Sequence, residues 1–259
     1  MSNTAANLVA LNTIVRREIV RIVRIWTQTL IPPAITMTLY FVIFGKLIGS
    51  RIGTIQGGFS YMQYIVPGLV MMSVINNCYA NISSSFFGAK FSRAVEEMLV
   101  SPMPNWVILL GYDTGAVARG LVVGAMVLGI ALLFTSLHVA HPFITFLSVL
   151  LGATIFSLAG FVNAVYAKKF DDIALVPTFI LTPLTYLGGV FYSVNMLSEP
   201  WRAISHANPI LYMVNAFRFG VLGISDVDVG IAFVVMLGFV VGLSIVALQL
   251  LKRGVGLRS

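Results

Sequence analysis

The chain has 259 residues, of which 58% are hydrophobic and 10% charged, and its mean hydropathy is +0.95. Soluble domains carry about 25% charged residues, so this composition excludes a soluble enzyme or binding domain and indicates an integral membrane protein. The net charge of +7 fits contact with anionic lipid head groups and gives no reason to expect a nucleic-acid partner.

Apolar stretches of roughly 20 residues, long enough to cross a bilayer as a helix, recur six times along the chain. The sequence therefore predicts an all-α integral membrane fold with six transmembrane helices, formed by residues 1–259 as a single domain. The predicted spans cover residues 26–49, 61–83, 108–135, 143–166, 172–192 and 229–250.

The segment before the first span, residues 4–25, repeats apolar residues at helical spacing and carries arginines on another face. This pattern predicts an amphipathic helix that lies along the membrane interface. Such a helix anchors the topology or guards a lateral entrance, and the residues do not distinguish the two roles.

Basic residues are distributed unevenly between alternate loops. The excess lies on the side that carries both chain ends, so the positive-inside rule places both termini in the cytoplasm. That side holds Arg16, Arg17, Arg21, Arg24, Lys90, Arg93, Lys168, Lys169, Lys252, Arg253 and Arg258, and the other holds Lys46, Arg51, Arg202 and Arg218.

Polar side chains line up within the spans at helical spacing, so they must face protein or water. They are predicted to line a translocation surface or, equally, to join helices by hydrogen bonds. Arg119 lies near the middle of the third span, where an unpaired cation costs at least ~2.5 kcal/mol, so it is expected to face the bundle interior. The candidates for the translocation surface are Thr36, Tyr40, Ser73, Asn77, Asn81, Arg119, Thr178, Thr182 and Thr185.

Proline and glycine mark two further features of the spans. Pro177 and Pro183 are expected to interrupt and bend the fifth span. The third span contains small residues at four-residue spacing, which lets other helices approach closely. These residues are Gly111, Gly115, Gly120 and Gly124.

A cytoplasmic helix is predicted at Phe86–Val100, within the region 86–104 between the second and third spans. One face is apolar and the other charged, Arg93 and Glu97 are four residues apart, and the sequence SPMP ends the helix. An ordinary loop needs neither face, so the pattern favours docking of a protein partner. The alternative is a solvated charge pair on a helix that lies on the membrane.

Residues 193–228 separate the fifth and sixth spans and are divided by Pro200 and Pro209. Apolar and aromatic residues continue through this segment, so it is expected to form short re-entrant helices on the external face. Irregular backbone at that depth is tolerated only where protein buries it.

Several catalytic patterns are missing from the chain. No lysine completes the sequence G-x-x-x-x-G-K-[ST], so the chain has no Walker A phosphate cradle and is not expected to hydrolyse ATP. The sequence also lacks G-x-S-x-G, H-E-x-x-H and any Cys/His cluster, so neither an enzyme nor a metal site is predicted.

In combination, these features resemble the permease subunit of ABC-2 type transporters, and the likeness covers essentially the whole chain. The motifs that carry it are FSYMQYIVPGLVMMSVI, SSFFGAKF, EEMLVSPMP, KKFDDIALVPTFILTPLTYLGGVFYS and ANPILYMVNAFRFG. The resemblance implies a type V exporter-like fold in a bacterial inner membrane, with an external motif formed by Asn208, Pro209, Tyr212 and Arg218.

The resemblance also implies partners. Two copies of the chain would form a homodimer and assemble with two cytoplasmic ATPase subunits that bind ATP and Mg²⁺, while this chain binds no cofactor. The region 86–104 would be the coupling helix, with its apolar stripe packed on the ATPase and its charges fixing the register. Its contact residues would be Phe87, Lys90, Phe91, Arg93, Glu96, Glu97, Leu99 and Pro102.

The alternative function is a self-contained channel or an ion-coupled secondary transporter, which normally needs buried carboxylates. Asp113 is the only acidic residue well inside a predicted span. The sequence does not identify the substrate, although narrow faces lined by apolar, Thr and Asn side chains favour a lipid-like or amphipathic molecule over a bulky glycan.

Overall fold

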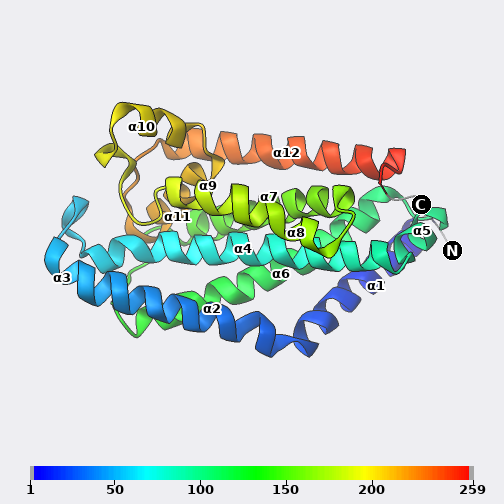
Figure 1. Ribbon diagram of the computed structural model, residues 1–259, viewed down its shortest axis with the longest axis horizontal. Helices are drawn as coiled ribbons and strands as arrows, with labels where there is room; N and C mark the ends of the chain where they lie inside the picture. The colour runs from blue at the N-terminus through cyan, green and yellow to red at the C-terminus, as the bar shows by residue number, and fades with distance from the viewer. Residues whose placement is uncertain (1–2, 257–259) are drawn as a thin grey trace.

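Helices make up almost all of the computed structural model, and most of them run along one long axis (Figure 1). The structure describes residues 3–256, except for the side chains of Asn3, Lys46 and Gln56. The predictions made for Lys46 and Arg258 therefore lie outside the described side chains. Within the described part, the only β pairing is an isolated bridge between Thr54 and Ser60.

Six helical segments are long and apolar enough to cross a membrane, which confirms the predicted number and order of spans. The first consists of α2 (Trp26–Tyr40), the π-helical stretch Phe41–Ile48 and α3 (Gly49–Ile52), and the fifth of α8 (Phe170–Val176), the π-helical stretch Pro177–Leu181 and α9 (Thr182–Leu187). The others are α4 (Tyr61–Phe91), α6 (Asn105–Leu132), α7 (Pro142–Tyr166) and α12 (Val229–Arg253).

The remaining helices lie at the two ends of the bundle. At one end, which we call the α5 end, lie α5, the start of α1 and the end of α12 (Figure 1). At the opposite end lie α3 and α10. The helices are α1 (Asn3–Arg24), α5 (Ala94–Val100), α10 (Glu199–His206) and α11 (Pro209–Leu222).

The core forms around α4, which is the most buried of the six spans and packs against α6, α7 and α11. Glycines permit these close approaches, as predicted for the third span. A Cβ on Gly124 would lie 2.7 Å from Val74 Cγ2, and a Cβ on Gly160 would lie 2.7 Å from the Tyr79 carbonyl oxygen. Larger residues at these positions would separate the helices.

The fifth span is interrupted where its prolines predicted a break. Pro177 begins the π-helical stretch and Pro183 lies in the first turn of α9. The backbone carbonyl of Pro177 accepts a hydrogen bond of 2.9 Å from the Thr182 hydroxyl. A nearby hydroxyl therefore compensates for an irregular helix within the membrane span, as membrane helices require.

The segment 193–228 forms short helices, as expected. A 3₁₀ turn, Val194–Met196, precedes α10, and α11 then returns into the bundle to pack against α7 and α12. Asn208 caps α11, because its side-chain oxygen accepts a hydrogen bond of 3.0 Å from the Ile210 amide. Most of α11 is buried, so protein surrounds this part of the segment.

Candidate functional site

A buried carboxylate joins α1 to the core. Glu18 is only 1% exposed, and the Ser85 hydroxyl of α4 lies 2.8 and 2.7 Å from its two oxygens. Arg21 donates from Nη2 to the same carboxylate at 3.1 Å, and Arg17 Nη2 lies 3.4 Å from it. A buried charge is stable only with such partners, so Glu18 fixes the position of α1 on the bundle.

The arginines that flank Glu18 extend the network. Arg17 donates to the Tyr112 hydroxyl of α6, and its guanidinium lies over the Tyr112 ring, 5.1 Å from the ring centroid. Burial alone would lower the pKa of Arg17, but Tyr112 and Glu18 outweigh it and raise that pKa above its ordinary value. The Arg17 guanidinium is therefore charged at any physiological pH.

The same network reaches the predicted residue Arg119. Arg21 Nη2 donates to Asn81 Oδ1 at 2.7 Å, and Arg119 Nη1 donates to the same oxygen at 3.3 Å. Arg119 Nη2 also donates to Asn77 Oδ1 at 3.4 Å, while its Nε is buried and has no hydrogen-bond partner among the described residues. Arg119 thus contacts α4, as expected for a side chain that faces the bundle interior, and two cations share one amide oxygen.

Glycines of α6 allow α1 to approach this closely. A Cβ on Gly111 would lie 2.6 Å from Ile14 Cγ2, and a Cβ on Gly115 would lie 2.5 Å from Glu18 Cβ. The helix α1 therefore packs against Gly111 and Gly115, whereas α4 packs against Gly120 and Gly124. One face of α1, with Ile14 and Glu18, is thereby packed on α6.

The predicted helix Phe86–Val100 is not continuous, which corrects that prediction. Its first part is the end of α4, and α5 begins only at Ala94. The break falls at Arg93, which has a φ of 62° and is the only non-glycine residue with positive φ in the described chain. Nothing in the residue type signals this left-handed conformation, which costs roughly 1–2 kcal/mol. No Arg93–Glu97 ion pair forms between these described side chains.

The apolar stripe of α5 faces the chain's own bundle. Val95 is fully buried, and Met98 and Leu99 are partly buried against the same cluster of core residues. The bundle therefore covers Val95 and part of Met98 and Leu99, whereas Phe91, which was predicted to belong to the same stripe, is 70% exposed. Glu97 and Val100 are exposed.

The other residues predicted around α5 lie on different surfaces. Lys90 donates from Nζ to the carbonyl oxygens of Val165 and Ala167 at 2.7 Å each, so it caps the C-terminal end of α7. Phe87 is buried with its ring centroid 4.8 Å from that of Phe170. Four further residues lie nearer the surface: Phe91, Arg93 and Pro102 are exposed, and Glu96 is half-buried in the first turn of α5.

Apart from Arg119, described above, the predicted translocation residues divide into two groups. Ser73, Asn81 and Thr185 are buried, and Asn77 is partly buried, so the chain's own helices cover them. Their position suits hydrogen bonding between helices, and contact with a substrate would require those helices to separate. The more accessible group consists of Thr36, Tyr40, Thr178 and Thr182, on the two spans with little burial, α2 and α8–α9.

A second polar cluster lies near the opposite end of the bundle. Arg218 is 1% exposed, donates from Nη2 to the Gly189 carbonyl at 2.7 Å, and has its Cζ 4.1 Å from the centroid of the Tyr64 ring. Asp226 accepts hydrogen bonds from the Ser193 hydroxyl at 2.8 Å and the Val194 amide at 3.1 Å. The predicted residue Arg218 thus helps to hold the end of the fifth span and the segment 193–228 together.

The other predicted external residues have local roles. Asn208 donates from Nδ2 to the Leu184 carbonyl at 2.5 Å, Pro209 occupies the first turn of α11, and the Tyr212 hydroxyl donates to the His206 carbonyl at 2.9 Å. Among the described residues, no group of three or more His, Cys, Asp or Glu side chains is arranged to hold a metal ion.

Comparison with known proteins then identifies the family. Residues 9–222 match the family described as ABC-2 type transporter. The chain belongs to the ABC-2 type transporter family. This ABC-2 permease is 58% identical over 251 residues to the inner membrane transport permease YadH of Escherichia coli (strain K12). The aligned residues make up 97% of this chain and 98% of that relative.

More distant relatives of the ABC-2 permease are also recognisable. Nodulation protein J of Neorhizobium galegae is 22% identical over 216 residues, covering 83% of this chain and 82% of that relative. Nodulation protein J of Rhizobium leguminosarum bv. trifolii is 26% identical over 197 residues, covering 74% and 73%. Both are less similar to this chain than YadH but span most of its length.

Sequence reasoning missed two acids of the ABC-2 permease, Glu18 and Asp226. Glu18 had a recognisable signal, because it is the single carboxylate within a helix that carries four arginines. Asp226 had none beyond its place in a long loop. Each of these carboxylates organises one of the two polar clusters.

Proposed function

We propose that this ABC-2 permease is the membrane-spanning subunit of an exporter in a bacterial inner membrane, driven by ATP hydrolysed on a separate subunit. The relative YadH carries the name inner membrane transport permease, which supports the location. The absence of a Walker A sequence supports a division of labour in which a partner binds ATP and Mg²⁺.

The observation that carries the proposal is the position of α5. This short helix lies at the basic end of the bundle, is anchored by Val95, and presents Glu97 and Val100 on its outer side. An exposed apolar residue beside an exposed charge is what a docking surface requires. In the proposal, α5 contacts the ATPase through this outer side.

The family resemblance supplies the expected assembly of two permeases with two ATPases. ATP binding would close the ATPase pair, α5 would follow, and the spans would change from inward-facing to outward-facing. The exposed polar side chains Thr36, Thr178 and Thr182 lie on the two spans least buried by the chain, α2 and α8–α9. We assign the permease dimer interface and its pathway to these spans.

The proposed substrate is a lipid-like or amphipathic molecule, and the proposed orientation places the α5 end in the cytoplasm. The last turn of α12, with Lys252 and Arg253, lies at that end, and Lys90 lies in the last turn of α4, which leads into α5, as the positive-inside rule requires. The exposed faces of α2 and α8–α9 alternate isolated hydroxyls with large apolar side chains, including Ile35 and Phe179. Such a surface solvates an acyl chain better than a polysaccharide.

The test is affinity purification of the tagged permease from its native membrane, with wild type compared to Glu97→Arg. We expect a soluble Walker-motif ATPase in near-equal amount with wild type and at least tenfold less with the variant, since reversing a charge at an interface introduces repulsion. The matched control is Glu199→Arg, an exposed charge reversal at the opposite end of the bundle, which should retain the ATPase.

Three outcomes would count against the proposal. Equal loss in both variants would indicate general damage, and equal retention would exclude Glu97 from the docking surface. If no ATPase is recovered even after crosslinking, an ion-coupled transporter becomes the better explanation. Asp113 would then be the group to test, because it is 9% exposed and its Oδ1 has no described hydrogen-bond partner.

A further inference from the structure

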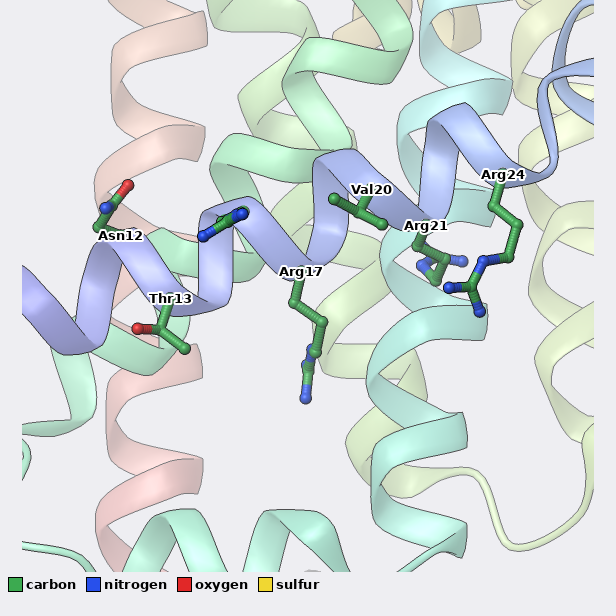
Figure 2. A pocket seen from close by; sticks show the side chains of 7 residues that line it. Asn12, Thr13, Arg17, Val20, Arg21 and Arg24 are labelled. Carbon is green, nitrogen blue, oxygen red and sulfur yellow. The ribbon is translucent and has the colours of Figure 1, made fainter.

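A basic pocket of about 550 Å³ lies along α1, on the side of the helix that the bundle leaves open. Arg16, Arg17, Arg21 and Arg24 line it together with Asn12 and Thr13. Figure 2 shows Arg17, Arg21 and Arg24 extending from this side of α1. These side chains project guanidinium groups into one space within four turns of a helix.

A second cleft of about 290 Å³ continues from this pocket toward α4. Arg17 and Arg21 line both spaces, and Ser84, Ser85 and Ser92 add hydroxyl groups on the α4 side. These hydroxyls already donate to Ala80, Glu18 and Ala89, so the guanidinium groups are the donors available to phosphate oxygens.

The charge of this surface is not balanced by the chain. Its lining contains four arginines and one carboxylate, Glu18, which leaves three positive charges. Glu18 is already shared by Arg17 and Arg21, and no ion pair is described for Arg16 or Arg24. A further anion is the simplest group that would neutralise these side chains.

Apolar surface adjoins the basic pocket. Val20 lines the pocket and is 47% exposed, and Val23 and Trp26 continue the apolar surface at 64% and 56% exposure. Val23 and Trp26 also line an apolar groove of about 250 Å³ between α1, α2 and α6. A free phosphate ion has no apolar group that could contact this surface, whereas the acyl chains of a lipid could pack against it.

We infer that the basic pocket of α1 binds the phosphate group of an anionic membrane lipid, whose acyl chains lie along Val20, Val23 and Trp26. Arg16 and Arg24 would contact the phosphate, while Arg17 and Arg21 remain tied to Glu18. The site is formed by one permease chain alone, so it depends neither on the ATPase nor on the proposed pathway.

The test titrates the purified permease in neutral detergent with phosphatidylglycerol and counts bound lipid by native mass spectrometry. The variant is Arg16→Gln/Arg24→Gln, which leaves the buried Glu18 contacts intact. Each basic side chain near an anionic lipid contributes about a factor of five in affinity, so we expect roughly 25-fold weaker binding. The matched control is Lys252→Gln/Arg253→Gln, two exposed cations at the end of α12 near α5.

Selective weakening in the Arg16→Gln/Arg24→Gln variant, with phosphatidylcholine binding much more weakly than phosphatidylglycerol, supports the site. Equal weakening in both double variants would overturn it, because general surface charge would then explain binding. Displacement of phosphatidylglycerol by millimolar inorganic phosphate would overturn the assignment to a lipid and leave a free phosphate site. Since no ATPase is present, failure here leaves the proposed transport function untouched.

Discussion

Replacing Glu18 by Gln should destabilise the permease strongly, although the substitution preserves side-chain volume. The carboxylate is 1% exposed and is bonded to the Ser85 hydroxyl and to Arg21. The amide that replaces it has one acceptor oxygen and no charge. Removing a single partner from a buried charge network leaves the other partners desolvated without compensation.

The magnitude follows from the exposure of each partner. The Ser85 bond changes from one with a charged acceptor, about 1.5–3 kcal/mol, to one with the neutral amide oxygen, about 0.5–1.5 kcal/mol, a loss of about 1–1.5 kcal/mol. The Arg21 pair contributes about 0.5–1 kcal/mol, because the Arg21 side chain is 28% exposed and regains some water. The expected loss in the free energy of unfolding is about 1.5–2.5 kcal/mol, and at roughly 2–4 °C per kcal/mol the midpoint of thermal unfolding should fall by about 3–10 °C.

The assay is thermal unfolding of the purified permease in one neutral detergent, with Glu199→Gln as the control. Glu199 pairs with Arg202 at 3.2 Å, but its side chain is 84% exposed, so its loss should change the free energy of unfolding by less than about 0.5 kcal/mol. A double-mutant cycle with Ser85→Ala should give a coupling above about 0.5 kcal/mol. The reasoning fails if Glu18→Gln unfolds within about 1 °C of wild type.

Three further substitutions test the packing and the second polar cluster by the same thermal assay. Gly160→Ala should lower the free energy of unfolding by about 1–3 kcal/mol, because its Cβ would meet the Tyr79 carbonyl oxygen and side chains of α4. Gly238→Ala, which has open space around it, should be neutral or stabilising by up to ~1 kcal/mol, and equal effects of the two substitutions would contradict this account of the close helix contact. Arg218→Met should cost about 2–4 kcal/mol through the lost Gly189 bond and ring contact, whereas the matched Arg202→Met should cost little because that side chain is 34% exposed. Lys90→Met should lower the free energy of unfolding by about 1–3 kcal/mol, because two carbonyls at the end of α7 lose the ammonium group that donates to them. An unchanged midpoint of thermal unfolding would show that water takes the place of this ammonium group.

The spans and the interruption of the fifth span could be predicted because each depends on local chemistry, whereas the π-helical stretch Phe41–Ile48 of the first span contains no proline and was not predicted. A bilayer requires about 20 apolar residues in any helix that crosses it, and a proline removes a backbone donor wherever it occurs. The close contacts at Gly111 and Gly120 followed from residue size in the same way. The helices that contact these glycines could not be predicted, because residue spacing within one helix does not indicate which other helix will pack against it.

Two features of the candidate site depend on tertiary packing and could not be predicted. The break before α5 falls at Arg93, a residue with no intrinsic preference for positive φ, so the surrounding helices must impose it. The amphipathic pattern of α5 was real, but it could not show whether its apolar side faced a partner or the bundle. Val95 is fully buried, so this residue of the apolar side faces the bundle.

The end of α4 connects α5 to three other helices, which bears on how a docked partner would act. Ser85 bonds to Glu18 of α1, Lys90 caps α7, and Phe87 packs on Phe170 at the start of α8. All three contacts lie within two turns before Arg93, where the backbone breaks. A force on α5 would therefore reach α1, α7 and α8 through packed side chains rather than being absorbed in a flexible loop. The helix α8 is the first part of the fifth span, which Pro177 and Pro183 interrupt. Movement should consequently appear first in α8–α9, which the chain buries least, while α4 stays in place.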